Sequence, residues 1–289
     1  MQGVGVPLVT PFDSDGDIDE QKLRELTSWV IENGVDFIVP CGSNGESELM
    51  TVSERSQVIE IVNQVSTVPV VAGTGHPGLT ETKQQTSQAT ASGVDAALII
   101  TPFYYTYGQD SIEEYFVNIA DSSDIPVYLY SVPVKTGLKL ATETIESLST
   151  HSNIHGIKDS SGDVVLLQQA IDGSSGEFHY LIGNGSLFAT GLEAGVEGGI
   201  LALANVVPEL VSEIYRYYQG GDRKEAQRLN RHLIELNQAI TSKYGIPGVK
   251  AAMKARGKPA GQTRSPLPTL STQSEREIQK LVQEAIRQK

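Results

Sequence analysis

The sequence of 289 residues predicts an α/β fold, a (β/α)8 TIM barrel with a small C-terminal helical extension. Short apolar runs alternate with amphipathic segments of helical length along the whole chain. The runs lack the polar alternation of half-exposed strands, as expected of parallel strands that are buried on both faces. Eight such runs occur, and this count favours a closed barrel over a doubly wound open sheet, which the same alternation also allows.

Each apolar run is predicted to form one strand. The first run, GVGVPLV, follows the N-terminal Met-Gln, and the last, GGILAL, precedes the region where only helices are expected. In a barrel the C-terminal ends of all strands meet at one face, where the loops build the active site. The eight predicted strands are 3–9, 36–40, 68–73, 95–101, 125–130, 153–158, 178–183 and 198–203.

Helices are predicted between the runs, and several have recognisable ends. The segments DIDE (17–20) and TVSE (51–54) both fit a capping box, an N-cap side chain with glutamate three residues later. Gly34 and Gly93 stand where C-terminal caps belong. These signals place the first two helices after residues 17 and 51.

The C-terminal part is predicted to be helical from about residue 207, which is more helix than eight units need. We therefore expect residues 1–206 to form the barrel with the active site. Residues 207–289 would form the last barrel helix and the extension.

Composition excludes several classes of function. With 35 acidic and 22 basic residues the formal charge is −13, so nucleic acid and anionic membranes would be repelled. The acids are spread along the chain, which indicates a solvated surface or adaptation to high salt. The single cysteine, Cys41, excludes an internal disulfide, and no Cys/His cluster predicts a metal site. The N-terminus has neither a basic flank nor a long apolar run, so we expect a cytoplasmic enzyme.

Polar side chains follow five of the predicted strands. Ser43 and Asn44 come after the second strand, and Tyr104 and Tyr105 come after the fourth. The fifth strand ends in Tyr130, the sixth in Lys158, and the seventh in the segment GNGS, 183–186. Hydroxyls, amides and one amine therefore converge on one face, without a clear histidine or a pair of carboxylates.

Lys158 ends the apolar strand in the stretch NIHGIKDSSGD, 153–163. An amine there can attack a ketone to form an imine, which withdraws electrons while an adjacent C–C bond is made or broken. The amine must be neutral to attack, and burial among apolar strands favours the neutral form. The alternative is a structural lysine paired with Asp159 or another acid.

Five motifs in order bring a resemblance to a known family. CGSNGES, VAGTGHPG, TPFYY, VYLYSVPVKTG and HGIKDSSGD resemble the dihydrodipicolinate synthase/N-acetylneuraminate lyase family, as do the C-terminal GIPGVKAAM and RSPLP. The resemblance covers essentially the whole chain. It implies a pyruvate-dependent class I aldolase that needs no cofactor and no metal, and that assembles as a homotetramer of two tight dimers.

The resemblance also assigns roles to residues. Lys158 would form the imine with pyruvate, and Tyr130 would move protons as the acid/base. Ser43 would link two tyrosines in a proton relay and, with Asn44, bind the pyruvate carboxylate. Tyr104 would be the relay tyrosine that reaches into a neighbouring subunit. Two further residues fall where the family lines its pocket with backbone, Gly183 and Ile200.

Departures from the synthase branch point to the substrate. That branch typically has two threonines where this chain has Ser43 and Asn44. It usually has asparagine and arginine where this chain has Ser131 and Lys135, and lysine lacks the bidentate fork of an arginine that grips a carboxylate.

The pattern looks more like archaeal aldolases that cleave 2-keto-3-deoxygluconate or its 6-phosphate in Entner–Doudoroff sugar breakdown. The synthase, which joins pyruvate and aspartate semialdehyde, is the alternative, followed by neuraminate lyases and sugar-acid dehydratases. A rival from another class is a ligand-sensing barrel that has lost catalysis.

Other features are interpreted as structural. GTGHPG (73–78) completes a GxGxxG pattern, but it lies in the third unit and contains Pro77, so we expect a strand-end turn near the active site. Cys41 is expected to be a small buried residue. Lys135 and Lys250 are candidates for contact with a substrate phosphate, and the alternative for each is a solvated side chain.

Overall fold

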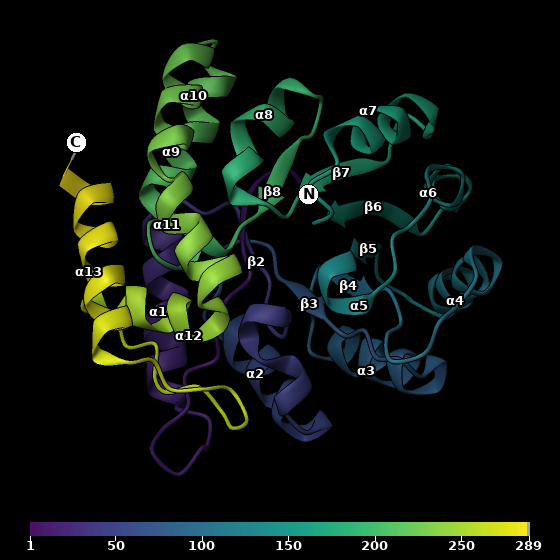
Figure 1. The fold of residues 1–289 in the computed structure, drawn as a ribbon. Coiled ribbons are helices and arrows are strands. Elements are labelled where there is room, and N and C mark those ends of the chain that lie inside the picture. The colour runs from purple at the N-terminus through teal and green to yellow at the C-terminus, as the bar shows by residue number, and fades with distance from the viewer. Residues whose placement is uncertain (288–289) are drawn as a thin grey trace.

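Eight short strands form one parallel sheet in the computed structural model, which describes residues 1–287. Their order is β2-β1-β8-β7-β6-β5-β4-β3, and all eight predicted strands are confirmed. Figure 1 shows them at the centre of the molecule, surrounded by helices. The strands are β1 Gly3–Val6, β2 Phe37–Ile38, β3 Val71–Gly73, β4 Ala96–Ile100, β5 Val127–Ser131, β6 Ile154–Asp159, β7 His179–Ile182 and β8 Gly198–Ile200.

The sheet closes between β2 and β3. A parallel bridge joins Ile38 to Val70, and the amide of Gly73 donates to the carbonyl of Pro40 at 2.9 Å. Closure removes the sheet edges and brings all eight C-terminal strand ends to one face. The predicted (β/α)8 barrel is therefore confirmed.

Helices follow the strands around the barrel. The barrel helices are α1 Glu20–Glu32, α2 Val52–Val65, α3 Leu79–Ala91, α4 Gln109–Asp121, α5 Pro133–Thr136, α6 Thr142–Ser149, α7 Val164–Gly173, α8 Phe188–Glu193 and α9 Pro208–Gln219. Beyond α9 come α10 Arg223–His232, α11 Ile234–Gln238, a π-helical turn η5 Ala239–Lys243, α12 Gly245–Ala255 and α13 Thr272–Arg287. Short 3₁₀ turns are η1 Ser43–Gly45, η2 Ser47–Leu49, η3 Gly185–Leu187 and η4 Ala202–Asn205.

The helix ends agree with the sequence at all but one position. Thr51 and Glu54 form the predicted capping box of α2, and Gly34 and Gly93 have the positive φ of C-terminal caps, +88° and +82°. The capping box predicted at residues 17–20 is wrong, because the N-cap of α1 is Asp19, which accepts from the amide of Lys22. The backbone of Asp17 is instead bonded to Asp13 in the preceding turn.

The barrel interior is filled by side chains, several of them large. One apolar cluster lies between the sheet and the helices, and a second lies inside the barrel. Tyr128, Tyr130 and Val132 of the chain around β5 belong to the inner cluster. Because neighbouring residues of a strand face opposite sides, Leu129 belongs to the outer cluster instead.

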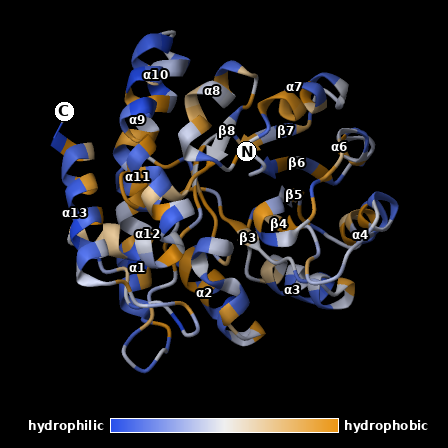
Figure 2. Ribbon diagram, in the orientation of Figure 1, coloured by the Kyte–Doolittle hydropathy of each residue, from blue (hydrophilic) through white to orange (hydrophobic). Residues whose placement is uncertain are grey.

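The C-terminal helices α10 to α13 gather on one side of the barrel, next to α1 and α9 (Figure 1). Hydrophilic residues predominate on α10 and on much of α13, whereas α8 and most of the strands carry apolar or neutral residues (Figure 2). None of the helices described has the length and apolar content needed to span a bilayer.

Candidate active site

A cavity of about 630 Å³ opens over the C-terminal ends of the strands. It is bounded by β5, β6 and the turn η1 on one side and by η5 on the other. Cavities of this size are typical of sites for small ligands. Seven of the predicted site residues line it, namely Ser43, Asn44, Tyr130, Lys135, Lys158, Gly183 and Ile200.

Lys158 lies at the end of β6 and is buried, with 6% of its surface exposed. It is in register with Tyr130 of β5 and Leu181 of β7. Its Nζ lies 4.1 Å from the centre of the Tyr130 ring. Among residues 1–287 no carboxylate forms an ion pair with Lys158. This placement favours a nucleophile over a structural ion pair.

Asp159, the acid proposed as a structural partner, turns the other way. Its carboxylate accepts hydrogen bonds from the amide of Ser161 at 3.0 Å and from the hydroxyl of Ser161 at 2.6 Å. Burial raises the pKa of Asp159, although these hydrogen bonds oppose the effect. The interaction holds the loop after β6 and leaves Lys158 to the cavity.

Tyr130 is buried beside the lysine, and its surroundings lower the pKa of its hydroxyl. Burial by itself raises the pKa of Tyr130, but the positive charge of Lys158, a hydrogen bond from Ser43 and the charge of Lys135 outweigh it, so that the pKa is lowered. A tyrosine of lowered pKa can accept and return a proton more readily than an ordinary one.

Ser43 and Asn44 lie in η1, a tight turn after β2. Two residues that are not glycine flank this turn in the left-handed region, Cys41 with φ 56° and Glu46 with φ 58°. Gly73 at the end of β3 allows the close approach, because a Cβ there would lie 2.2 Å from the carbonyl oxygen of Cys41. The segment GTGHPG is therefore a strand-end turn beside this loop, as predicted.

Cys41 itself is buried in this loop. Burial raises the pKa of its thiol to about 12, so the thiolate is disfavoured. The residue therefore contributes packing rather than a nucleophile.

Tyr104 is the one predicted site residue that does not line the cavity. It is 86% exposed, and its backbone is held at φ 81° in the loop after β4. Its ring packs edge-on against Tyr105, with 5.0 Å between the ring centres. Within one chain, the side chain of Tyr104 is therefore exposed to solvent and does not reach the cavity.

A second chamber of about 350 Å³ shares a wall with the main cavity. Ser43, Tyr130 and Lys135 line both, so this wall separates two spaces that meet at the same side chains. The lining of the second chamber is mostly apolar and includes Leu98, Ile100, Phe103 and Leu267, although Glu46, Glu48 and Arg55 also line it.

The outer wall of the main cavity is polar and was only partly predicted. Asn184 and Ser186 belong to the GNGS segment, and Ser160 follows the lysine strand. Thr241 and Ser242 come from the π-helical turn η5, where the sequence carries no signal beyond helical periodicity. Residues after 207 thus line the site, although only residues 1–206 were expected to carry it.

The part of the chain that is described holds no cluster of three or more His, Cys, Asp or Glu side chains placed to bind a metal ion.

Comparison with known proteins identifies the family to which the chain is similar. Residues 1–285 match the Dihydrodipicolinate synthetase family. An uncharacterized DapA-like lyase of Halobacterium salinarum is 39% identical over 269 residues, which cover 92% of this chain and 88% of that protein. The 4-hydroxy-tetrahydrodipicolinate synthase of Citrifermentans bemidjiense is 37% identical over 272 residues, 93% of each chain.

A solved structure agrees in fold over nearly the whole chain. The chloride-inhibited dihydrodipicolinate synthase of Acinetobacter baumannii, complexed with pyruvate, superposes with a TM-score of 0.93 at 31% identity. The match covers 98% of each chain.

Proposed function

The chain belongs to the dihydrodipicolinate synthetase family of aldolase-type lyases, and we propose that it cleaves 2-keto-3-deoxygluconate or its 6-phosphate. The products would be pyruvate and glyceraldehyde or its 3-phosphate. The proposal rests above all on Lys158, a buried amine without a carboxylate partner among the described residues, beside Tyr130 in a cavity that both residues line.

In the proposed reaction, the neutral amine of Lys158 adds to the C2 ketone of the sugar acid. The resulting hydroxyl leaves as water with one proton from the solvent, which gives an iminium ion. The phenolate of Tyr130 takes the proton of the C4 hydroxyl as the C3–C4 bond breaks. The electron pair of that bond passes to the iminium ion and forms an enamine, while C4 becomes the aldehyde carbonyl. Tyr130 then returns the proton to C3, and water hydrolyses the iminium ion to release pyruvate and the free amine, with one proton returned to the solvent.

The turn η1 is proposed to bind the pyruvate carboxylate. Ser43 supplies a hydroxyl, Asn44 supplies an amide, and both line the cavity that holds Lys158. Such donors suit a carboxylate because they satisfy its oxygens without moving a proton. Gly183 allows the lysine side chain to lie close, because a Cβ there would be 3.1 Å from Cε of Lys158.

A sugar acid suits the outer wall of the cavity. Several hydroxyl and amide side chains line the cavity, among them Ser160, Asn184 and Thr241. They can donate to and accept from the hydroxyl groups of a polyol tail. Among the described lining residues Lys135 is the charged group besides Lys158, and it would contact an acidic or phosphorylated tail.

The synthase remains a second candidate, because curated relatives such as that of Citrifermentans bemidjiense carry that name at 37% identity. Lys135 would then meet the carboxylate of aspartate semialdehyde, but as a point charge rather than as a fork.

A second subunit would complete the proton relay. Tyr104 is exposed and held outward by its backbone, and the mostly apolar chamber beside Ser43 and Tyr130 has room for a ring. We include in the proposal a tetramer in which Tyr104 enters the neighbouring subunit's chamber. A cytoplasmic location and salt adaptation also belong to it, the latter supported by the charge of −13 and the Halobacterium relative.

Release of pyruvate tests the proposal. The purified protein is mixed, at low and at molar salt, with 2-keto-3-deoxygluconate or its 6-phosphate, and pyruvate is measured over time. Fast release from either substrate supports the aldolase, and the ratio of the two rates reports the preferred tail. No release from either, together with condensation of pyruvate with aspartate semialdehyde, would establish the synthase instead.

A further inference from the structure

The residue that follows the carboxylate-binding turn has a strained backbone and a buried charge. Glu46 joins η1 to η2 in the left-handed region, at φ 58° and ψ 34°. For a residue other than glycine this conformation is sterically strained. The side chain of Glu46 is fully buried. Both features require compensation by groups that hold the carboxylate.

Lys250 of α12 supplies that compensation from the C-terminal extension. Its Nζ lies 2.6 Å from Oε1 of Glu46, and 4% of its side chain is exposed. The same ammonium donates to the carbonyl oxygens of Thr10 at 2.7 Å and Gln262 at 2.6 Å. Lys250 is therefore neither solvated nor in the cavity, so both alternatives considered from the sequence are wrong.

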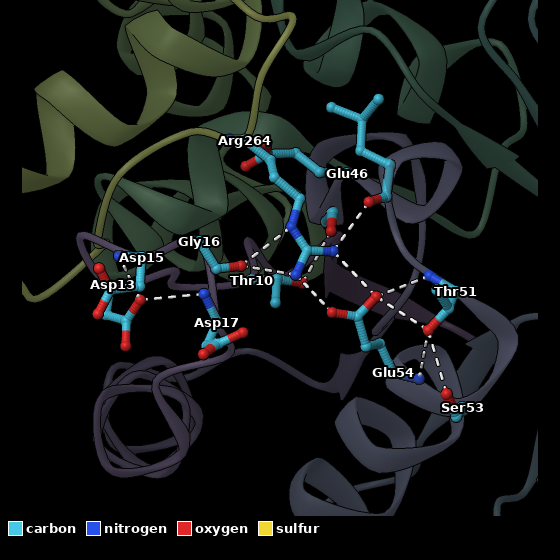
Figure 3. A network of polar contacts seen from close by, with 12 residues as sticks. Thr10, Asp13, Asp15, Gly16, Asp17, Glu46, Thr51, Ser53, Glu54 and Arg264 are labelled. Carbon is cyan, nitrogen blue, oxygen red and sulfur yellow. Dashed lines mark hydrogen bonds and ion pairs between the residues drawn. The ribbon is translucent and has the colours of Figure 1, made fainter.

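Arg264, from the same part of the chain, also binds the carboxylate of Glu46. The backbone amide of Arg264 donates to Oε2 of Glu46 at 2.8 Å. The guanidinium of Arg264 donates hydrogen bonds to the carbonyls of Gly16 and Leu49 and to the carboxylate of Glu54 (Figure 3). Leu49 ends η2, so Arg264 holds the far end of the same loop.

The turn η1 is held directly as well. The hydroxyl of Thr10 donates to the carbonyl of Gly45 at 2.8 Å, and the carbonyl of Thr10 accepts from Lys250. Gly45 packs so closely that a Cβ would lie 3.0 Å from the carbonyl oxygen of Leu8. Residues 43–45 are thus fixed between the end of β1 and the Glu46–Lys250 pair.

We propose that the buried Glu46–Lys250 ion pair is a positioning device that aims Ser43 and Asn44 at the carboxylate of a 2-keto acid bound to Lys158. This inference rests on the proposed function, because it assumes that η1 binds that carboxylate. Neither Glu46 nor Lys250 is a catalytic residue. Neither lines the cavity that holds Lys158, and they act on it through the turn η1, although Glu46 also borders the second chamber.

A positioning role can be told from a purely structural one by replacing both charged residues with neutral ones and comparing folding with pyruvate binding. Exchanging a buried ion pair for apolar or neutral groups of similar volume often leaves stability unchanged. The double variant Glu46→Gln/Lys250→Met leaves no unpaired buried charge, so it is expected to fold, with a lower thermal midpoint because the carbonyls of Thr10 and Gln262 lose their donor. It also loses the ion pair that holds residue 46 at positive φ, so the turn is free to shift.

Two ketones separate carboxylate binding from lysine reactivity. Pyruvate carries the carboxylate, whereas hydroxyacetone is a neutral ketone that reaches Lys158 without it. For each probe, covalent trapping with borohydride is measured over a range of ketone concentrations to give the half-saturating concentration. We expect the double variant to need roughly tenfold to a hundredfold more pyruvate, as for a displacement of about 1 Å, with hydroxyacetone unchanged.

The control exchanges another ion pair of the same extension. Arg256 and Glu209 are paired at 2.8 Å, and neither lines the cavity. The variant Glu209→Gln/Arg256→Met should therefore leave the half-saturating concentrations of both ketones unchanged. If the Glu46/Lys250 double variant does not fold, Glu46→Gln alone is measured, since its amide keeps the size and one acceptor for Lys250.

The inference would be overturned if a folded variant had the same half-saturating pyruvate concentration as the wild type. It would also be overturned if the half-saturating concentrations of pyruvate and hydroxyacetone rose by the same factor. Failure of both variants to fold would also overturn it, because the pair would then serve the fold. If the wild-type protein traps no pyruvate, it is the proposed function that fails.

Discussion

Replacing Arg264 by methionine is expected to destabilise the protein at neutral pH and much less in acid. The guanidinium of Arg264 is paired with Glu54 at the start of α2, and this hydrogen bond is the largest reason why the pKa of Glu54 is lowered from 4.5 to about 2. At about 1.4 kcal/mol per pKa unit, the difference corresponds to at most roughly 3–4 kcal/mol.

The pair is partly open to solvent, with side chains 18% and 24% exposed, so screening reduces this figure. We expect a loss of about 1–2 kcal/mol in the free energy of unfolding at pH 7. Because the pKa of Glu54 is depressed in the folded state, the stabilisation is complete above its unfolded value of 4.5. It is lost as the pH falls from there towards about 2.

Urea unfolding at pH 7 and at pH 3 measures the effect, with Arg228→Met as the matched control. Arg228 pairs with Glu225 on an exposed face of α10, and its replacement should change the free energy of unfolding by no more than about 0.5 kcal/mol. The difference in the free energy of unfolding between the wild type and Arg264→Met should be smaller at pH 3 than at pH 7. An equal difference at both, or none at pH 7, would refute the assigned origin of the stabilisation.

Three further predictions concern the reaction. Tyr130→Phe should lower kcat by about 10²–10⁴ while borohydride still traps pyruvate, and loss of trapping would show that the hydroxyl is needed earlier. Lys135→Met removes a charge that lowers the pKa of Tyr130, so the pH at which activity rises should move upward and the KM for the sugar acid should increase; unchanged pH profiles would contradict this. Mixing the inactive variants Tyr104→Ala and Lys158→Ala after dissociation should restore activity, because each hybrid subunit pair contains one complete site. No recovery would argue against a shared relay.

Most of the fold was predictable because its determinants are local. Each strand is a short apolar run, and the ends of α1, α2 and α3 are marked by a capping box or a glycine of positive φ. The misplaced start of α1 shows the limit of such signals. Asp17 and Asp19 both have suitable side chains, and the choice between them depends on the turn that Asp13 closes.

The base of the candidate site was also predictable, because strand order alone carries Tyr130 and Lys158 to the same barrel face. Contacts that depend on distant segments were not. Lys250 lies 204 positions after Glu46 in the sequence, and nothing near either residue indicates a buried ion pair. The contribution of Thr241 and Ser242 has the same origin, since η5 meets the cavity only once the extension has folded back.

The central claim is that Lys158 forms an imine with pyruvate, and mass spectrometry tests it most directly. The protein is incubated with pyruvate, reduced with borohydride and digested, and the modified peptide is sequenced. We predict one adduct, on Lys158, which is absent from Lys158→Ala although that variant folds. An adduct on Lys135 or Lys250 instead, or pyruvate trapped by Lys158→Ala as fully as by the wild type, would contradict the account.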